Sequence, residues 1–280
     1  MPAELINDLK SIELAIFDLD GVIYRGDNLI PGVVEVINLL KNLSIRVVFN
    51  SNNSTLTRKN YVEKLQQFGI SSNIEDIFTS ASITAEEISK IKPRAKIYVI
   101  GEMGLKKELE AKNHQILESV NDLSNIDFVI VGLDRNFNYQ KLAIAQHLIS
   151  RGHARFYATN VDATLPDKDK ELPGAGCMVA ALQTCTSEKP IKIFGKPSPL
   201  GIKMILETNK IQGHKAAIFG DRLDTDILAG NRANIITVLL LTGVTSLTQV
   251  KELEKNRGIV DNNLIPNMII HSLGEIFEKP

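Results

Sequence analysis

Short runs of β-branched and aromatic residues alternate along the whole chain with longer amphipathic segments. The strand-like runs lie at residues 13–17, 45–49, 77–78, 96–100, 127–131, 155–158, 191–194, 216–219 and 235–241. Between them, apolar side chains recur at helical spacing, as in the segment that Pro31 and Gly32 open. This alternation is typical of βαβ units, so the sequence predicts an α/β fold with a doubly wound parallel sheet.

The length of the chain leaves room for more than one domain. With 280 residues it is about twice as long as a typical domain. Its 44% hydrophobic and 23% charged residues are ordinary for a globular protein and exclude a disordered or collagen-like chain. Residues 83–189 have strands and helices of their own. We therefore expect a core from residues 1–82 and 190–280, with an inserted α/β domain at residues 83–189.

The net charge, the apolar runs and the cysteines of the chain indicate which binding partners and which compartment to expect. Lys and Arg number 32 and Asp and Glu number 33, so the net charge of −1 would not attract a polyanion or an acidic membrane. Residues 1–10 lack the pattern of a signal peptide, and the apolar run 235–241 is too short to span a bilayer. Cys177 and Cys185 lack metal-ligand spacing. These features predict a cytoplasmic protein without nucleic-acid or membrane partners.

Polar side chains follow four of the predicted strands. They are Asp18 and Asp20, Ser51, Lys196, and Asp221. In open α/β sheets, ligands bind outside the carboxyl ends of the strands. We therefore expect these side chains to converge on one crevice, although Asp18 and Asp20 taken alone would also fit a simple turn with two hydrated carboxylates.

Three common motifs do not fit these segments. An EF-hand loop needs a ligand and a glycine where Val22 and Ile23 stand. The segment 195–198 lacks the upstream glycine of a phosphate-binding Walker loop. Residues 159–176 are polar and are expected to form a loop. Gly174 and Gly176 stand in this loop and do not follow a strand, which argues against a dinucleotide fingerprint.

In their order along the chain, the polar segments resemble the four motifs of the haloacid dehalogenase superfamily of phosphohydrolases. They read Asp18-Leu19-Asp20-Gly21, Ser51-Asn52-Asn53-Ser54, Lys196 and Gly220-Asp221-Arg222-Leu223-Asp224-Thr225-Asp226. The insertion looks like the large α/β cap of this superfamily. Segments 131–134, 159–166 and 195–199 are most similar to its branch of p-nitrophenyl, phosphoglycolate, pyridoxal-phosphate and nucleotide phosphatases.

The charges in these motifs call for a cation. The acidic residues are Asp18, Asp20, Asp221 and Asp226. Together with a phosphate dianion, they would face only the single positive charge of Lys196, which is unstable without a divalent cation and a proton on one carboxylate. Magnesium prefers carboxylate, water and phosphate oxygens. We therefore predict a magnesium-dependent enzyme.

The resemblance implies a role for each acidic residue. Asp18 would be the nucleophile that forms an aspartyl-phosphate, and Asp20 would act first as the acid and then as the base. The metal would be held by the Asp18 carboxylate, the Asp20 backbone carbonyl and Asp221, with Asp226 in the first or second shell. Asp224 would only fix the loop.

The resemblance also implies the groups that bind phosphate. Ser51 and the amides of Asn52 and Asn53 would donate to phosphate oxygens, while Lys196 would neutralise negative charge in the transition state. An alternative in which Asn53 only closes the turn stays open. Arg222 is expected to form a local ion pair.

The inserted cap would select the substrate. The residues to inspect are Arg135, Tyr139, Asn160, Asp162 and Leu165. Leu165 is expected either to contact the substrate from the catalytic face or to pack its own loop. Related proteins with this cap type suggest a homodimer formed through it.

The expected function is magnesium-dependent hydrolysis of a small-molecule phosphate ester, of the phosphoglycolate or p-nitrophenyl phosphate type. Pyridoxal phosphate, sugar phosphates and nucleotides are alternative substrates. Phosphotransfer to an acceptor other than water and non-catalytic binding of a phosphorylated ligand are the competing functions.

Overall fold

The computed structural model describes residues 4–117, 125–167, 170–256 and 261–278. It divides into two compact units. The core unit comprises Met1–Ser51, Val62–Phe78 and Lys196–Pro280, and the inserted unit comprises Asn52–Tyr61 and Thr79–Gly195. The inserted unit is thus longer than the predicted insertion at residues 83–189, and it includes the segment that follows Ser51.

The core unit is built on a parallel sheet. Within the described residues this sheet has six strands in the order β15-β14-β13-β1-β4-β5. Their bounds are β1 (Leu14–Phe17), β4 (Arg46–Ser51), β5 (Ile77–Thr79), β13 (Ala216–Gly220), β14 (Ile236–Leu240) and β15 (Met268–Ile270). Strand β1 pairs in parallel with β13 and β4, and β14 pairs in parallel with β13 and β15. All residues of β1 are buried, as a central parallel strand requires.

Chain order reverses next to β1. From β1 the chain proceeds outward through β4 and β5, and it later returns to the other side of β1 to form β13, β14 and β15. Such a reversal is a topological switch point, where the loops at the carboxyl ends of neighbouring strands diverge and leave a crevice. The fold therefore places the site at the ends of β1, β4 and β13.

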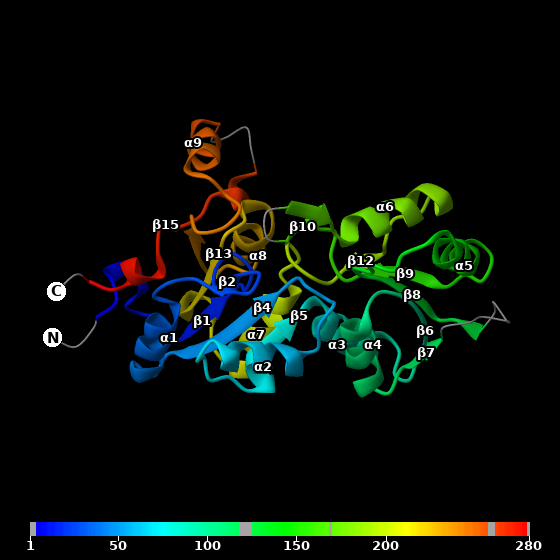
Figure 1. Ribbon diagram of the computed structural model, residues 1–280, viewed down its shortest axis with the longest axis horizontal. Helices are drawn as coiled ribbons and strands as arrows, with labels where there is room; N and C mark the ends of the chain where they lie inside the picture. The colour runs from blue at the N-terminus through cyan, green and yellow to red at the C-terminus, as the bar shows by residue number, and fades with distance from the viewer. Residues whose placement is uncertain (1–3, 118–124, 168–169, 257–260, 279–280) are drawn as a thin grey trace. The chain divides into compact units, whose positions relative to one another are not determined.

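Helices cover both sides of the core sheet. They are α1 (Val33–Asn42), α2 (Arg58–Gln67), α7 (Leu200–Asn209), α8 (Leu228–Arg232) and α9 (Leu247–Lys255). Helix α1 buries Val33, Val36, Ile37 and Leu40, the apolar stripe visible in the sequence. Figure 1 shows α2 below β1 and β4, and α8 beside β13. A π-helical turn, Leu223–Ile227, leads into α8.

The inserted unit has its own parallel sheet. In the part of the chain that the structure describes, its five strands follow the order β12-β9-β8-β6-β7. They are β6 (Lys96–Ile100), β7 (Gln115–Leu117), β8 (Phe128–Val131), β9 (Arg155–Ala158) and β12 (Lys192–Ile193), and each of the four adjacent pairs is parallel.

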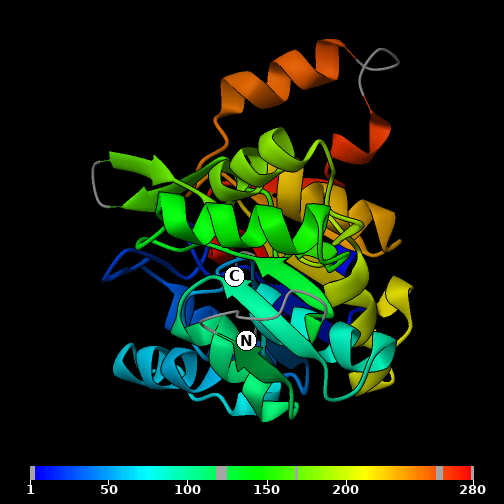
Figure 2. The same ribbon diagram turned by 90° about the vertical axis from the view of Figure 1, so that its right-hand side faces the viewer.

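Two helix pairs accompany this second sheet. They are α3 (Ser80–Ile91) with α4 (Met103–Ala111), and α5 (Tyr139–Ser150) with α6 (Ala175–Thr186). Figures 1 and 2 show α5 and α6 together on one side of the sheet. There Leu148 of α5 and Leu182 of α6 join Val129, Val131 and Phe156 in one apolar cluster. The inserted unit thus has a hydrophobic core of its own.

Short elements complete the fold. Two antiparallel pairs are β2 (Tyr24–Arg25) with β3 (Asn28–Leu29) and β10 (Thr164–Asp167) with β11 (Lys170–Pro173). Short 3-10 helices lie at Asn7–Leu9, Ile74–Asp76, Gly213–Lys215, Asn262–Leu264 and Leu273–Ile276. No helix in the described ranges is long and apolar enough to cross a membrane.

Two sequence expectations about strands were wrong. Residues 191–194 were expected to return to the core sheet, but β12 pairs with β9 in the inserted sheet. The backbone continues this pairing, because the Phe194 N–H donates to the Ala158 carbonyl at 3.1 Å. The polar segment 159–176, expected as a loop, contains the β10–β11 hairpin.

Candidate active site

The first carboxylate of the site directly follows the central strand. Asp18 comes after β1 and is buried. Its backbone N–H donates to the Phe219 carbonyl of β13 at 2.9 Å, so the sheet pairing extends to this residue. This hydrogen bond to β13 fixes the position of the Asp18 backbone at the carboxyl end of β1.

Asp221 directly follows β13 and is buried against the backbone. Its Oδ2 accepts from the Val244 N–H at 2.7 Å. Two glycines make room for it. A Cβ on Gly21 would lie 2.4 Å from Asp221 Oδ2, and one on Gly243 would lie 1.8 Å away. Gly21 also has φ +83°, a conformation that other L-residues rarely adopt.

Asp226 reaches the same place from the π-helical turn. It is fully buried, and its Oδ2 accepts from the Arg222 N–H at 3.2 Å. A Cβ on Gly220 would lie 2.1 Å from the Asp226 Cβ. Carboxylate oxygens of Asp18, Asp221 and Asp226 lie within 4.8 Å of one another. Three of the four acidic residues predicted for the site therefore form one buried cluster, here called the acidic cluster.

Lys196 lies in this cluster. Its Nζ is 2.6 Å from Asp18 Oδ1 and 2.5 Å from Asp226 Oδ1, and it donates to the Asn50 carbonyl at 2.9 Å. The lysine is buried. The structure thus brings Lys196 to the acidic cluster as predicted, although the preceding strand belongs to the other sheet.

The acidic cluster contains more negative than positive charge. Burial, reinforced by the neighbouring carboxylates, raises the pKa of Asp18 well above its usual range despite the opposing effect of Lys196. Burial and repulsion from Asp226 raise the pKa of Asp221 to about 7. Burial alone would lower the pKa of Lys196, but the paired carboxylates raise it overall. Three carboxylates beside one ammonium leave the cluster undercompensated.

A divalent cation fits this cluster. Buried carboxylate oxygens within 4.8 Å of one another match the oxygen ligands that magnesium prefers. Burial and the neighbouring carboxylates raise the pKa of Asp18 and of Asp221, and a bound cation would offset this effect. Asp18, Asp221 and Asp226 are the residues that would hold such an ion.

Asp20 lies two residues beyond Asp18, at the turn that Gly21 makes possible. Burial raises the pKa of its carboxyl, against the attraction of Lys64 and Lys196. A carboxyl with a raised pKa keeps its proton to a higher pH than an ordinary carboxyl and can release it to a leaving group. The side chain of Asp20 is not part of the acidic cluster. A metal contact through the Asp20 backbone carbonyl stays a prediction from the family resemblance.

The three residues predicted to bind phosphate divide between the units. Ser51 ends β4 in the core unit and is buried. Asn52 begins the inserted unit, where its Nδ2 donates to both carboxylate oxygens of Asp162 at 3.0 and 3.1 Å. Asn53 Oδ1 accepts from the N–H and the hydroxyl of Thr55 at 2.8 and 2.7 Å, so this side chain closes a local turn.

The cap residues singled out in the sequence have different surroundings. Leu165 lies on β10 and packs against the apolar cluster of the inserted unit. Arg135 forms an ion pair with Glu102 at 3.1 Å, and Tyr139 is 85% exposed. These contacts account for the fixed positions of Leu165 and Arg135, and the substrate contact of Leu165 stays a prediction.

Arg222 forms the expected local ion pair. Its guanidinium lies 3.2 and 3.1 Å from the two carboxylate oxygens of Asp224, in a bidentate geometry. Asp224 thus restrains the loop from its exposed side, while Asp226 enters the acidic cluster.

Sequence reasoning missed two contributors to the acidic cluster. The Asn50 carbonyl holds Lys196, and Gly243 allows Val244 to approach Asp221. The only sequence signal for Gly243 was its place after the predicted strand 235–241, which repeats the pattern of the other strand ends.

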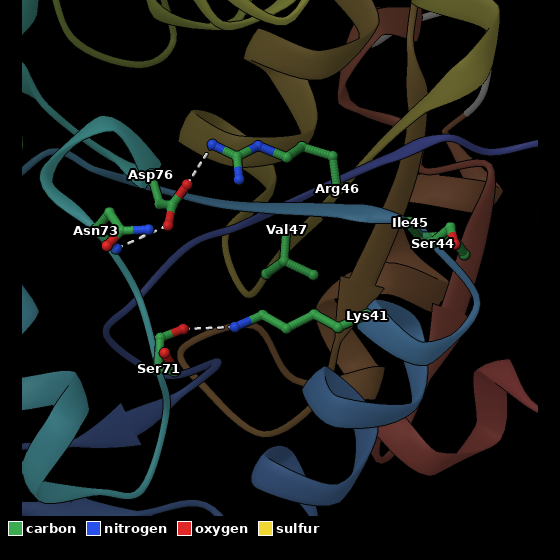
Figure 3. Close-up of a pocket in the computed structure, with 8 residues that line it drawn as sticks. All are labelled: Lys41, Ser44, Ile45, Arg46, Val47, Ser71, Asn73 and Asp76. Carbon is green, nitrogen blue, oxygen red and sulfur yellow. Dashed lines mark hydrogen bonds and ion pairs between the residues drawn. The ribbon is translucent and has the colours of Figure 1, made fainter.

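A separate pocket of about 330 Å³ lies at the opposite, amino-terminal end of β4. Figure 3 shows its charged side chains already engaged: Arg46 pairs with Asp76, and Lys41 donates to the Ser71 carbonyl. Because Ser51 is at the other end of β4, this pocket is distinct from the acidic cluster.

Comparison with known proteins assigns the family. A family model described as haloacid dehalogenase-like hydrolase matches residues 15–115, and a second one, described as HAD-hydrolase-like, matches residues 193–275. The chain is 38% identical over 265 residues to phosphoglycolate phosphatase 1A, chloroplastic, of Arabidopsis thaliana, and the match covers 88% of this chain and 73% of that protein. The chain belongs to the haloacid dehalogenase-like hydrolases.

Solved structures agree with this family assignment. The 4-nitrophenylphosphatase of Thermotoga maritima matches with a TM-score of 0.86 and 36% identity, over 96% of this chain and 98% of that one. A glycerol phosphate phosphatase of Mycobacterium tuberculosis in complex with magnesium matches with a TM-score of 0.85 and 29% identity, over 98% of this chain and 79% of that one.

The family assignment confirms two expectations from the sequence. One is the fold class, an α/β fold with a doubly wound parallel core and an inserted α/β cap domain. The other is that the chain is an enzyme, a haloacid dehalogenase-like hydrolase that acts on phosphoric monoesters.

Proposed function

We propose that this hydrolase is a magnesium-dependent phosphatase of small-molecule phosphate monoesters, of the phosphoglycolate or p-nitrophenyl phosphate type. The observation that carries the proposal is the buried acidic cluster with Lys196 at the carboxyl ends of β1 and β13. The relatives named phosphoglycolate phosphatase and 4-nitrophenylphosphatase support the choice of substrates.

In the first step, Asp18 is the nucleophile. One carboxylate oxygen of Asp18 forms a bond to phosphorus while the bond from phosphorus to the ester oxygen breaks. Asp20 gives its proton to the departing oxygen, which leaves as an alcohol. Lys196 holds Asp18 Oδ1, so it orients the carboxylate and offsets negative charge at the phosphoryl group.

In the second step, Asp20 is the base. It takes a proton from a water molecule whose oxygen bonds to phosphorus, and the bond between phosphorus and Asp18 breaks. The products are inorganic phosphate, the restored Asp18 carboxylate and a protonated Asp20 ready for the next cycle. The raised pKa of Asp20 suits a group that alternates between acid and base.

The residues proposed to hold magnesium are Asp18, Asp221 and Asp226, with the Asp20 backbone carbonyl as a further ligand. When bound, the ion supplies positive charge that neutralises the carboxylates and the phosphate oxygens. Asp221 is fixed for this task by the Val244 N–H, and Asp226 by the Arg222 N–H.

Phosphate binding is proposed for Ser51 and the backbone N–H groups of Asn52 and Asn53. The Asn53 side chain is already used to close its turn with Thr55, so its contribution would be limited to the backbone. Leu165 is proposed to contact the leaving group. Other substrates of the same chemistry are pyridoxal phosphate, sugar phosphates and nucleotides.

The wider assembly is also a proposal. The inserted unit exposes several apolar side chains, with Tyr139 85%, Ile191 63% and Met103 59% exposed, and a homodimer formed through this unit would cover such residues. Light scattering of the purified protein tests for the dimer. The free cysteines Cys177 and Cys185 fit the reducing cytoplasm proposed from the sequence.

The test is release of inorganic phosphate from phosphoglycolate and p-nitrophenyl phosphate. We expect hydrolysis that requires magnesium, stops with excess EDTA and is absent from Asp18→Asn. Leu43→Ala, a change at an exposed position of the core unit, is the matched control and should keep wild-type rates. Hydrolysis that persists in EDTA, or in Asp18→Asn, would contradict the proposal.

A further inference from the structure

The inserted unit contains a polar cluster whose side-chain contacts have no role in the proposed mechanism. It is here called the junction cluster, and its members are Asn52, Ser80, Thr159, Asn160, Asp162 and Gly195. Ser80, Thr159 and Asn160 are buried, and Asn52 and Asp162 are half-buried. Partly desolvated polar groups of this kind are costly unless they are paired, so their contacts define the geometry closely.

Asp162 is the centre of the junction cluster. Both of its carboxylate oxygens accept from Asn52 Nδ2, at 3.0 and 3.1 Å. Asn160 Nδ2 donates to Asp162 Oδ2 at 2.9 Å, and Asn160 Oδ1 in turn accepts from the Thr159 hydroxyl at 2.8 Å. The carboxylate is therefore oriented from its own loop and directed at the Asn52 amide.

Asn52 is also held at its backbone, and its amide oxygen lies close to Gly195. The Ser80 hydroxyl donates to the Asn52 carbonyl at 2.5 Å. A Cβ on Gly195 would lie 2.6 Å from Asn52 Oδ1 and 2.6 Å from the Thr159 carbonyl, so only glycine fits there. The Gly195 N–H donates to that same carbonyl at 2.6 Å.

The two chain segments fixed here continue directly into the proposed machinery. Asn52 follows Ser51, and Gly195 precedes Lys196. Consecutive Cα atoms are about 3.8 Å apart, so restraint at one residue strongly limits the position of the next. Asp162 can therefore influence phosphate binding without touching the substrate.

We propose that Asp162 is a positioning residue, which orients Asn52 and thereby the phosphate-binding segment at Ser51 and Asn52. This inference rests on the proposed phosphatase function. The change Asp162→Asn would replace the carboxylate that Asn52 Nδ2 contacts by an amide with one acceptor oxygen in place of two. The phosphate-binding segment would then lose its fixed orientation.

The test measures steady-state hydrolysis of p-nitrophenyl phosphate and its inhibition by inorganic phosphate for Asp162→Asn. We expect the inhibition constant and KM to rise about tenfold or more, while the magnesium concentration for half-maximal activity stays near the wild-type value. The matched control is Asp134→Asn. It removes another buried carboxylate of the inserted unit, one that pairs with Lys141 at 2.7 Å and does not contact Asn52.

The exchanged variant, Asn52→Asp combined with Asp162→Asn, restores an amide facing a carboxylate in the reverse order. It should recover part of the phosphate affinity lost in Asp162→Asn, because the effects of residues that share a hydrogen bond are coupled. Equal phosphate affinity in Asp162→Asn and Asp134→Asn would overturn the inference. It would also be overturned if the exchanged variant lost phosphate affinity by the product of the factors measured for Asn52→Asp and Asp162→Asn alone.

A second variant covers the case in which Asp162→Asn does not fold. Asn52→Ala removes the donor and leaves Asp162 its bond from Asn160. The same rise in the phosphate inhibition constant is expected, and an unchanged constant would overturn the inference. An inactive wild-type protein would instead contradict the proposed function, so the two failures are distinguishable.

Discussion

Glycines determine whether the acidic cluster can form. Gly243 is the clearest case, because a Cβ there would lie 1.8 Å from Asp221 Oδ2 and 2.3 Å from Asp221 Cβ. Backbone would have to move to relieve such an overlap, since the contacted atoms belong to a buried side chain. The close approach of the Val244 N–H to Asp221 depends on the absence of a side chain at this position.

Gly243→Ala should therefore reduce hydrolysis at least about a hundredfold, because a displacement of about 1 Å in a catalytic group is enough for such a loss. Gly274→Ala is the matched control, since a Cβ there would meet nothing closer than 3.9 Å. Phosphate release by both variants provides the measurement. Wild-type rates in Gly243→Ala would show that Asp221 does not need its observed position.

The charge of Asp221 is expected to destabilise the metal-free protein. Its pKa is raised to about 7 by burial and by Asp226, so the folded state binds a proton more readily than the unfolded state. This proton therefore stabilises the folded state fully at a pH below the pKa of Asp221 in the unfolded chain. The stabilisation is lost as the pH rises through about 7.

Asp221→Asn can retain the acceptor for the Val244 N–H without the charge. In EDTA at about pH 8, this variant should melt at least about 2 °C above the wild type, and the difference should shrink below pH 7. Thermal denaturation at several pH values checks this. A melting temperature below that of the wild type at pH 8 would count against the account of the charges.

Three of the four acidic residues predicted from the sequence, Asp18, Asp221 and Asp226, meet in the acidic cluster, whereas the Asp20 side chain is not part of it. Asp18 and Asp221 directly follow strands that are adjacent in the sheet, and parallel strands bring their carboxyl ends to one edge. The Asn50 carbonyl and Gly243 could not be predicted, because their roles depend on how closely two distant segments approach in three dimensions.

At the scale of secondary structure, His114 links helix α3 to the segment before β6. Its Nδ1 accepts from the Ala95 N–H at 3.1 Å, and its Nε2 lies 2.9 Å from the Ser89 hydroxyl. An accepting Nδ1 requires a neutral imidazole. Burial lowers the pKa of His114, in agreement with that requirement.

The stability of the protein should consequently fall in mild acid. Unfolded histidine titrates near pH 6.5, and the folded pKa of His114 is lower. The unfolded state therefore binds the proton more readily than the folded state. The neutral His114 stabilises the folded state fully above about pH 6.5, and this stabilisation is lost as the pH falls below that value.

His114→Asn keeps an acceptor for the Ala95 N–H and removes the titration. Its free energy of unfolding should depend less on pH between about 7 and 5 than that of the wild type. The exposed His271→Asn is the control. Urea denaturation across this range provides the measurement, and identical slopes for the wild type and His114→Asn would refute the assignment.

Element types were easier to predict than their partners. The runs at β1, β6 and β13 are apolar and lie where the sequence placed them. Strand β12 has only two residues, and nothing in its composition indicates that it pairs with β9 instead of with the core sheet. The β10–β11 hairpin was missed because its polar residues and prolines are typical of a loop.

At the scale of the whole molecule, two independently packed units supply different parts of the proposed function. The core unit contains the acidic cluster and Lys196, and the inserted unit contains the junction cluster. The chain passes from one unit to the other directly after Ser51 and directly before Lys196. This arrangement is the basis of the proposal that the phosphate-binding segment depends on residues of the inserted unit.

Magnesium should stabilise the folded protein as a whole, because the acidic cluster assembles only in the folded state. At a free magnesium concentration about 100 times its Kd, the stabilisation would be about 2.7 kcal/mol. Calorimetry with and without magnesium measures it, and Asp221→Asn should show little of this effect. An unchanged melting temperature of the wild type in saturating magnesium would speak against a metal in the cluster.

The proposed mechanism requires that Asp18 becomes phosphorylated, and the variant Asp20→Asn allows this step to be measured. p-Nitrophenolate leaves readily without a proton, so Asp20→Asn should complete the first step but be slow in the second, which needs the base. Mass spectrometry of protein quenched after mixing with p-nitrophenyl phosphate and magnesium should find one phosphoryl group on the peptide that contains Asp18. This phosphoryl group should be absent from the double variant that carries both Asp18→Asn and Asp20→Asn. A rapidly quenched sample with released p-nitrophenolate but no phosphoryl group on that peptide would contradict the account.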